Sequence, residues 1–196
     1  LLPQCLSQPR EAQSQDFIAI SHPTVATSPA RLGPIPSTMA SHLEKTMLRA
    51  FEAHSNHDLD NAIALYGQLL GMQLDRNMRG LIYNHRGMAY FAMGHHQRAL
   101  KDFSSAIRYN AENDQGHANR GLCHRVLKKP ERALLDFDQA LKINPNRPDG
   151  YFGRAQTYYD MQQYDRALDD CEKALAIHSG YQPARDLIKI LQQELP

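Results

Sequence analysis

From residue 41 onward, apolar residues recur at intervals of three and four, the spacing that places them on one face of a helix. The segment from His42 to His54 shows this pattern, and the segment from Leu59 to Leu70 resumes it after a polar break at Asn56–Asp58. Similar breaks follow along the chain, so the pattern alternates between amphipathic helices and short turns. It predicts an all-α protein.

The helical pattern repeats with a fixed period. Ala99, Ala133 and Ala167 are spaced 34 residues apart, and other columns of the same alignment also hold similar residues. A constant period of this length, made of two helical halves, is the signature of stacked helical hairpins. The further matching columns hold Gly87, Gly121 and Ala155; Phe103, Phe137 and Cys171; and Ala106, Ala140 and Ala174.

The period divides the chain from residue 41 to residue 196 into four hairpins and a closing helix. A degenerate first repeat covers residues 43–79, in which Ala62 and Tyr66 occupy the alanine and phenylalanine columns. Because Ala62 lies 37 residues before Ala99, three additional residues fall between Gly71 and Arg79. We expect a longer loop or an extra helical turn there. The remaining elements are repeats at 80–113, 114–147 and 148–181, and an amphipathic cap at 182–195 that closes the exposed end.

Residues 1–40 differ in composition. They hold six of the eleven prolines together with scattered Ser, Thr and Gln, and no helical or strand period persists. Such a segment buries too little apolar surface to offset its chain entropy, so a flexible tail is predicted. Only Asp16–Ile20 is apolar enough to pair with a neighbour or to dock on the domain.

The repeated Gly, Tyr, Ala, Phe, Ala and Pro columns resemble the tetratricopeptide repeat over residues 43–181 and the cap. The resemblance implies a right-handed superhelix, an α-solenoid of antiparallel helix pairs whose first helices line a concave face. The chain departs from the family pattern at a few positions. Ala50 replaces the first glycine, Cys171 replaces an aromatic residue, and Ala111 and Ser179 stand where proline is usual.

The composition of the chain argues against several classes of binding partner. The chain has 22 Lys and Arg against 21 Asp and Glu, for a net charge of +1, so nucleic acid and anionic membrane surfaces are not indicated. No apolar run approaches the roughly 20 residues that span a bilayer. Cys123 and Cys171 fall in small-residue columns, which favours buried free thiols over a disulfide. Cys5 lies in the tail. The three cysteines do not show whether the protein resides in a reducing or an oxidising compartment.

Charged residues recur with the same period. Arg86, Arg120 and Arg154 precede the small-residue column of three repeats, and Asp102, Asp136 and Asp170 precede the aromatic column on the facing helix. Ion pairs within each hairpin are the simpler interpretation, and a ladder of cations for a ligand is the alternative. The first repeat has no such pair, because Leu65 stands opposite Arg49.

No catalytic, metal or cofactor site is indicated. The chain lacks a Gly-rich phosphate loop, a nucleophile elbow and an HExxH pair. Its ten histidines include His117 and His124, which share one helix face in columns that are aromatic elsewhere. None of the histidines joins Cys or carboxylates at ligand-like spacing, so core or solvated histidines are expected.

The resemblance therefore directs attention to the concave face. Met and aromatic side chains along such a face suit an extended or helical peptide. Asn84 and Asn119 are candidates to hydrogen-bond its backbone, and Arg125 to meet a carboxylate. The alternative is that these residues pack on the tail or on a second copy. The predicted lining comprises Met47, Phe51, Asn84, His85, Met88, Phe91, Ala118, Asn119, Leu122, Arg125, Phe152, Gln156 and Tyr159.

One family subtype is testable from the residues. Co-chaperones of this family that hold the acidic C-terminus of heat-shock chaperones carry Lys and Asn on one first helix, Asn on the next, and Lys and Arg on the third. Here Asn119 matches the middle position, but Asn84 and Met88 replace the first pair, and Asp149 and Gly153 replace the last. The two-carboxylate clamp is therefore predicted to be absent.

Three functional hypotheses remain. The first is a non-catalytic adaptor or scaffold that binds a peptide or protein segment in the concave groove. The second is a homo-oligomeric assembly factor, in which hairpins or the tail dock onto neighbouring copies. The third, prompted by a chain that starts with Leu1, is an accessory domain from a longer protein.

Overall fold

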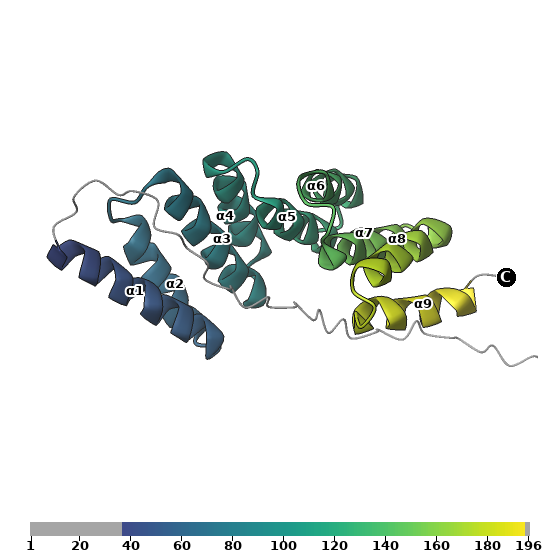
Figure 1. Cartoon of the computed structure of the whole chain (residues 1–196), viewed down its shortest axis with the longest axis horizontal. Coiled ribbons are helices and arrows are strands. Elements are labelled where there is room, and N and C mark those ends of the chain that lie inside the picture. The colour runs from purple at the N-terminus through teal and green to yellow at the C-terminus, as the bar shows by residue number, and fades with distance from the viewer. Residues whose placement is uncertain (1–36, 195–196) are drawn as a thin grey trace, which may run out of the picture. The chain divides into compact units, whose positions relative to one another are not determined.

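A computed structural model describes residues 37–194, and side chains from residue 42 to residue 193. Within those residues the protein is helical and contains no strand (Figure 1). The predictions for the tail, including Cys5 and Asp16–Ile20, fall outside the described residues. In chain order the helices are α1 (Ser37–Ser55), α2 (Leu59–Leu70), α3 (Arg76–Ala92), α4 (His96–Tyr109), α5 (Asp114–Val126), α6 (Pro130–Ile143), α7 (Pro148–Asp160), α8 (Tyr164–Ile177) and α9 (Gln182–Glu194).

The helices pack in sequence order. Four antiparallel pairs form, α1 with α2, α3 with α4, α5 with α6 and α7 with α8, and α9 packs on α8. Each pair also contacts the next, and the first helices of neighbouring pairs touch, α3 against α5 and α5 against α7. The predicted α-solenoid of stacked helix pairs with a closing helix is therefore confirmed. The first helices form one continuous side of the stack, which we call the first-helix face.

Small residues allow the two helices of a hairpin to approach closely. Ala99, Ala133 and Ala167 are fully buried, as the periodic columns predict. A Cβ atom added at Gly87 would lie 2.7 Å from Cε1 of Phe103, and one added at Gly121 would lie 3.2 Å from the carbonyl oxygen of Ala133. This column therefore holds glycine in the second and third repeats, because a side chain at either position would push the facing helix away.

Each hairpin turn contains one residue in the left-handed region. Gly94 has φ of 76°, and the equivalent residues of the other hairpins, His57, Lys128 and Gln162, have φ of 60°, 55° and 60°. Glycine adopts this conformation without penalty, whereas a residue with a Cβ is strained. Only the second hairpin has the unstrained residue at this position.

This difference between Gly94 and Lys128 predicts that opposite substitutions at the two positions have opposite effects on stability. Gly94→Ala is expected to lower the free energy of unfolding by about 1 kcal/mol, and Lys128→Gly to raise it by a similar or smaller amount. Urea denaturation followed by circular dichroism measures both changes. Two shifts of the same sign would show that backbone strain does not govern these turns.

The additional residues of the first repeat form an extra helical turn, one of the two predicted outcomes. Helix α3 has 17 residues, whereas α5 and α7 have 13 each. From this turn, the Arg76 side chain donates to the carbonyl oxygens of Tyr109 (2.8 Å) and Arg108 (3.0 Å), and that of Arg79 to those of Leu70 (3.0 Å) and Met72 (3.2 Å). The extra turn thus caps the carboxyl ends of α2 and α4.

Helix α9 closes the stack as predicted. Ala184, Leu187 and Leu191 are buried in a cluster with residues of α7 and α8. The other side of α9 carries polar residues such as Arg185 and Lys189, which remain exposed. A polar outer side is what the last unit of a repeat array requires. At the opposite end, α1 begins at Ser37, before the predicted boundary at residue 41.

Candidate functional site

The periodic arginines form ion pairs within their hairpins, as the sequence predicts. Arg86 Nε lies 2.7 Å from Asp102 Oδ2, Arg120 Nη2 lies 2.6 Å from Asp136 Oδ1, and Arg154 Nε lies 2.7 Å from Asp170 Oδ2. All three carboxylates are buried. These cations are therefore engaged in the scaffold, which removes the alternative of a cation ladder for a ligand.

The third hairpin surrounds its ion pair with histidines. His117 Nδ1 and His124 Nε2 lie 3.8 and 3.7 Å from the carboxylate of Asp136, in columns that hold tyrosine in the second and fourth repeats. Both rings are buried, so the prediction of core histidines is confirmed for this pair. Burial disfavours ionisation of Asp136, but the neighbouring His117 ring and the hydrogen bonds from Arg120 outweigh it and hold the pKa of this carboxyl below its usual value.

Half-buried apolar side chains cross the first-helix face. Phe51 on α1, Met88 on α3 and Leu122 on α5 occupy equivalent positions of successive repeats, and each is partly exposed. In the fourth repeat the same position holds Gln156, also partly exposed. We call Phe51, Met88 and Leu122 the apolar row. Met47 and Phe152 of the predicted lining are likewise partly exposed.

Two asparagines of the predicted lining join neighbouring repeats. Asn84 is only 2% exposed, and its Oδ1 accepts a hydrogen bond of 3.2 Å from Nδ2 of Asn119, which lies on the next first helix. Asn84 Nδ2 in turn lies 3.8 Å from Sδ of Met88. Asn84 therefore positions Asn119 and Met88 from beneath the surface. The prediction that Asn84 hydrogen-bonds a peptide backbone is corrected, because its amide is buried and already paired.

Three further predicted residues lie deeper than expected. Ala118 and Phe91 are buried, and the Phe91 ring lies 5.0 Å from that of His96, so neither offers a surface to a partner. The ring of His85 packs 4.9 Å from Phe51 and 6.0 Å from Tyr66. Only part of the predicted lining is thus accessible. The reason is that the first helices contact one another directly, which covers the side chains between them.

Arg125 is paired within the array. Its Nη1 lies 3.2 Å from Oδ2 of Asp160, at the end of the neighbouring first helix α7. A carboxylate from a partner would have to compete with Asp160, which the sequence interpretation did not identify. The two residues are 35 apart, so the repeat period itself was the signal that could have found the pair.

Two aromatic residues of the predicted lining pack against other rings of the fourth repeat. The ring of Tyr159 lies 5.7 Å from that of Tyr164, and the ring of Phe152 lies 5.7 Å from that of Tyr181.

The first-helix face also includes exposed leucines that the sequence interpretation missed. Leu48 on α1 is 59% exposed and Leu81 on α3 is 42% exposed. Leu48 precedes Phe51 by one helical turn, and Leu81 precedes Met88 by two, so both extend the apolar row along their helices. Apolar surface therefore concentrates on the first two repeats of this face.

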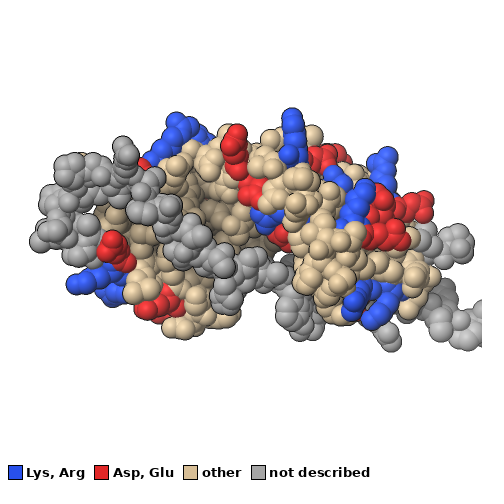
Figure 2. All heavy atoms as spheres, in the orientation of Figure 1, with Lys and Arg blue, Asp and Glu red and all other residues tan. Residues whose placement is uncertain are grey.

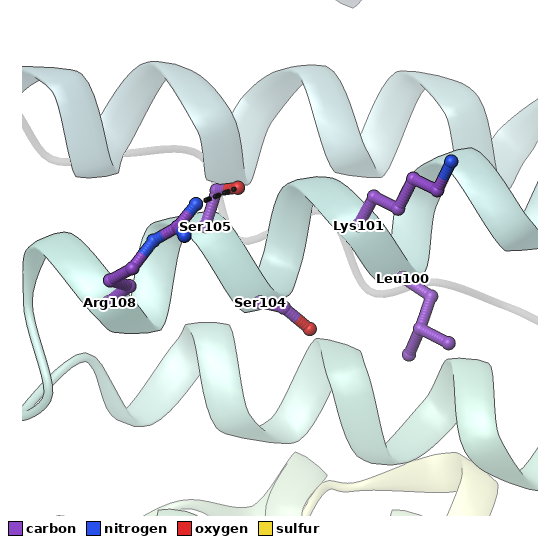
Figure 3. A pocket seen from close by; sticks show the side chains of 5 residues that line it. All are labelled: Leu100, Lys101, Ser104, Ser105 and Arg108. Atoms are coloured by element: carbon purple, nitrogen blue, oxygen red, sulfur yellow. Dashed lines mark hydrogen bonds between the residues drawn. The ribbon is translucent and has the colours of Figure 1, made fainter.

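A separate hollow lies on α4, a second helix. It measures about 500 Å³, and Figure 3 shows that the side chains lining it all come from this one helix. Arg108 Nη2 donates to Ser105 Oγ over 3.2 Å, so its polar groups partly satisfy one another. A hollow lined by one helix brings no groups together from different elements, which distinguishes it from a built binding site. The lining residues are Leu100, Lys101, Ser104, Ser105 and Arg108.

Other kinds of site are not apparent in the part of the chain that the structure describes. Residues 37–194 contain no group of three or more His, Cys, Asp or Glu that could hold a metal ion. None of the described helices is long and apolar enough to cross a membrane. Figure 2 shows charges of both signs interspersed over the visible face. Cys123 and Cys171 are buried free thiols, as predicted, and burial raises the pKa of each to about 12.

Comparison with known proteins agrees with this architecture. Two models described as tetratricopeptide repeat match residues 84–148 and residues 148–181, which together make half of the chain. The chain belongs to the tetratricopeptide repeat (TPR) family. No curated protein matches its sequence.

Solved TPR structures share the fold. The crystal structure of MamA is 19% identical and covers 79% of this chain and 83% of its own, with a TM-score of 0.66. YrrB, whose structure is described as a TPR protein with an unusual peptide-binding site, is 18% identical over 76% of each chain, with a TM-score of 0.65. The second TPR domain of human RPAP3, solved with an HSP70 peptide, is 21% identical and covers 60% of this chain and 98% of its own, with a TM-score of 0.57.

Proposed function

We propose that this TPR protein is a non-catalytic adaptor that binds a peptide or protein segment on its first-helix face. The observation that carries the proposal is the apolar row, since Phe51, Met88 and Leu122 keep part of their apolar surface exposed on three successive first helices. Exposed apolar side chains that are aligned in this way provide contact area for a partner. Related folds have been solved with chaperone peptides bound, which makes a peptide a reasonable partner class.

The chemistry of this face favours apolar side chains over a terminal carboxylate. Arg125 is paired with Asp160, and Asp149 is paired with Arg147 where the chaperone-binding clamp would carry a cation. Asn84, at another clamp position, is buried. Asn119 is the remaining polar candidate, because it is partly exposed and held in place by Asn84. We therefore expect a partner that presents apolar side chains and whose backbone is hydrogen-bonded by Asn119.

A pair of charge substitutions tests the proposal. Met88→Glu combined with Phe152→Glu is expected to abolish partner capture, because each carboxylate would have to be desolvated against an apolar partner. Helicity and thermal stability should remain, since both side chains are partly exposed. Affinity purification of the full chain, with partners identified by mass spectrometry, measures the loss.

The matched control is Leu135→Glu. Leu135 lies on α6, a second helix, and is 70% exposed, so its substitution adds a carboxylate away from the first-helix face. The control should retain all partners. Capture that survives the double substitution would place binding elsewhere. A concentration series by light scattering accompanies the assay, because binding by a monomer excludes self-association as the source of the captured material.

A further inference from the structure

Four rings meet where the first hairpin packs on the second. Phe51 and His54 come from α1, Tyr66 from α2 and His85 from α3. The His85 ring lies 4.9 Å from Phe51, 6.0 Å from Tyr66 and 6.4 Å from His54, and His54 Nδ1 lies 3.2 Å from the Tyr66 hydroxyl. We call these four residues the ring cluster. His85 is its only member from the second hairpin, and its contacts add to those of Ile82 and Arg79, which also hold the first hairpin against α3.

The ring cluster provides no counter-charge for a protonated histidine. The titratable groups that face His85 are His54 on α1 and Tyr66 on α2, and His57 in the following turn acts on His54. No Asp or Glu of the described residues contributes to the pKa of either His54 or His85. Burial, with a smaller effect of His54, lowers the pKa of His85 to about 4, and burial together with His57 lowers that of His54.

The buried histidines of the third hairpin have a different environment. His117 and His124 lie 3.8 and 3.7 Å from the carboxylate of Asp136. Burial lowers the pKa of His124, and Asp136 opposes that shift. The third hairpin therefore has a carboxylate that opposes the effect of burial, whereas the ring cluster has none among the described residues. The protein contains both arrangements, so one serves as an internal control for the other.

The contacts between the later hairpins do not depend on a neutral histidine. The second and third hairpins are joined by the hydrogen bond between Asn119 and Asn84. The third and fourth are joined by Arg125 with Asp160 and by Arg147, which immediately precedes α7, with Asp114. Neither pair contains a histidine, whose ordinary pKa makes it the side chain that titrates between pH 5 and pH 7. Protonation of histidine in this pH range is therefore expected to weaken the contact between the first and second hairpins and not the contacts between later hairpins.

We propose that the ring cluster is an acid-sensitive joint, in which protonation of His85 undocks the first hairpin (α1 and α2) from α3 while the later hairpins stay stacked. The proton comes from solvent and is carried by the imidazole once the ring is exposed to water. The proposal does not depend on whether the first-helix face binds a partner. If it does, undocking would remove Met47 and Phe51 from that face.

The direction and size of the effect follow from proton linkage. The undocked histidine has its ordinary affinity for protons and the docked one a lower affinity, so acid favours the undocked state as the pH falls below 6.5. For a pKa of 6.5 undocked and about 4 docked, lowering the pH from 7 to 5 raises the undocked-to-docked ratio by about 20-fold. Above pH 6.5 the docked state is fully favoured.

Hydrogen–deuterium exchange of the full chain at pH 7 and pH 5 tests the joint, after correction for intrinsic exchange rates. Amides of α1 and α2 are expected to lose protection by about 20-fold relative to those of α7 and α8. His85→Asn, which installs the residue that the third repeat carries at this position, should remove most of that dependence. His124→Tyr, which installs the tyrosine of the second and fourth repeats, should leave it intact.

Two results would overturn the proposal. One is equal loss of protection in all hairpins of the unaltered protein, which needs no variant and therefore does not depend on whether His85→Asn folds. The other is an unchanged pH dependence in a folded His85→Asn protein, checked by circular dichroism. If His124→Tyr, and not His85→Asn, abolishes the pH dependence of protection, the acid sensitivity belongs to the third hairpin.

Discussion

Replacing Gly153 with alanine is expected to lower the free energy of unfolding by about 1–3 kcal/mol. Gly153 lies on α7, and a Cβ atom there would be 2.5 Å from Cε1 and 2.6 Å from Cζ of Phe137, which projects from α6 of the preceding hairpin. Phe137 is itself buried, so its ring cannot move into solvent without losing its own contacts. Urea denaturation of the variant, followed by circular dichroism, measures the change.

Gly67→Ala is the matched control. Gly67 lies within helix α2, and no atom lies within 4 Å of a Cβ added there. Alanine in a helix interior is favoured over glycine by roughly 0.5–1 kcal/mol, so this variant should be slightly stabilised. If both variants unfold at the same urea concentration, Phe137 does not occupy the space above Gly153, and the packing between the third and fourth hairpins must differ.

Removing the carboxylate of Asp170 should have a comparable or larger effect. Asp170 is 1% exposed and receives hydrogen bonds of 2.7 and 2.8 Å from the Arg154 guanidinium. These bonds raise the pKa of Arg154, but a guanidinium is charged at neutral pH even without a partner, so Arg154 keeps its charge when Asp170 is removed. Asp170→Ala would leave this partly buried charge beside a cavity, and a loss of about 3 kcal/mol in unfolding free energy is expected. Thermal and urea denaturation both report it.

Arg154 also allows a buried and an exposed partner to be compared. Arg154 also donates to Asp138 over 2.6 Å, but the Asp138 side chain is exposed. Asp138→Ala should therefore cost less than about 1 kcal/mol, as exposed pairs usually do. Equal costs for the two substitutions would mean that burial does not decide the strength of these pairs. The first repeat, which has Leu65 opposite Arg49, shows that an array tolerates a hairpin without the pair.

The sequence predicts features that lie within one hairpin. Arg86 and Asp102 are 16 residues apart, and the same separation recurs in the next two repeats, so the period alone placed each pair on facing helices. The extra residues that lengthen α3 were found from the same period. Such contacts depend on local helix geometry, which a repeated pattern specifies.

Features that join hairpins were harder to predict. Asn84 was expected on the surface, but contact between first helices buries it beneath Asn119. The Arg125–Asp160 pair was likewise missed. These contacts depend on how far one hairpin is rotated against the next, and this rotation is set by side-chain packing that the period does not encode. The accessible part of the site consequently differs from the predicted lining.

A photo-reactive benzoylphenylalanine placed in turn at position 122 and at position 135 of the full chain tests the binding surface most directly. Leu122 belongs to the apolar row on the first-helix face, whereas Leu135 is exposed on a second helix. After irradiation in an extract of the cells that make the protein, covalent partner adducts are expected from position 122 and not from position 135. Adducts that form at position 135 and are absent at position 122 would contradict binding on the first-helix face.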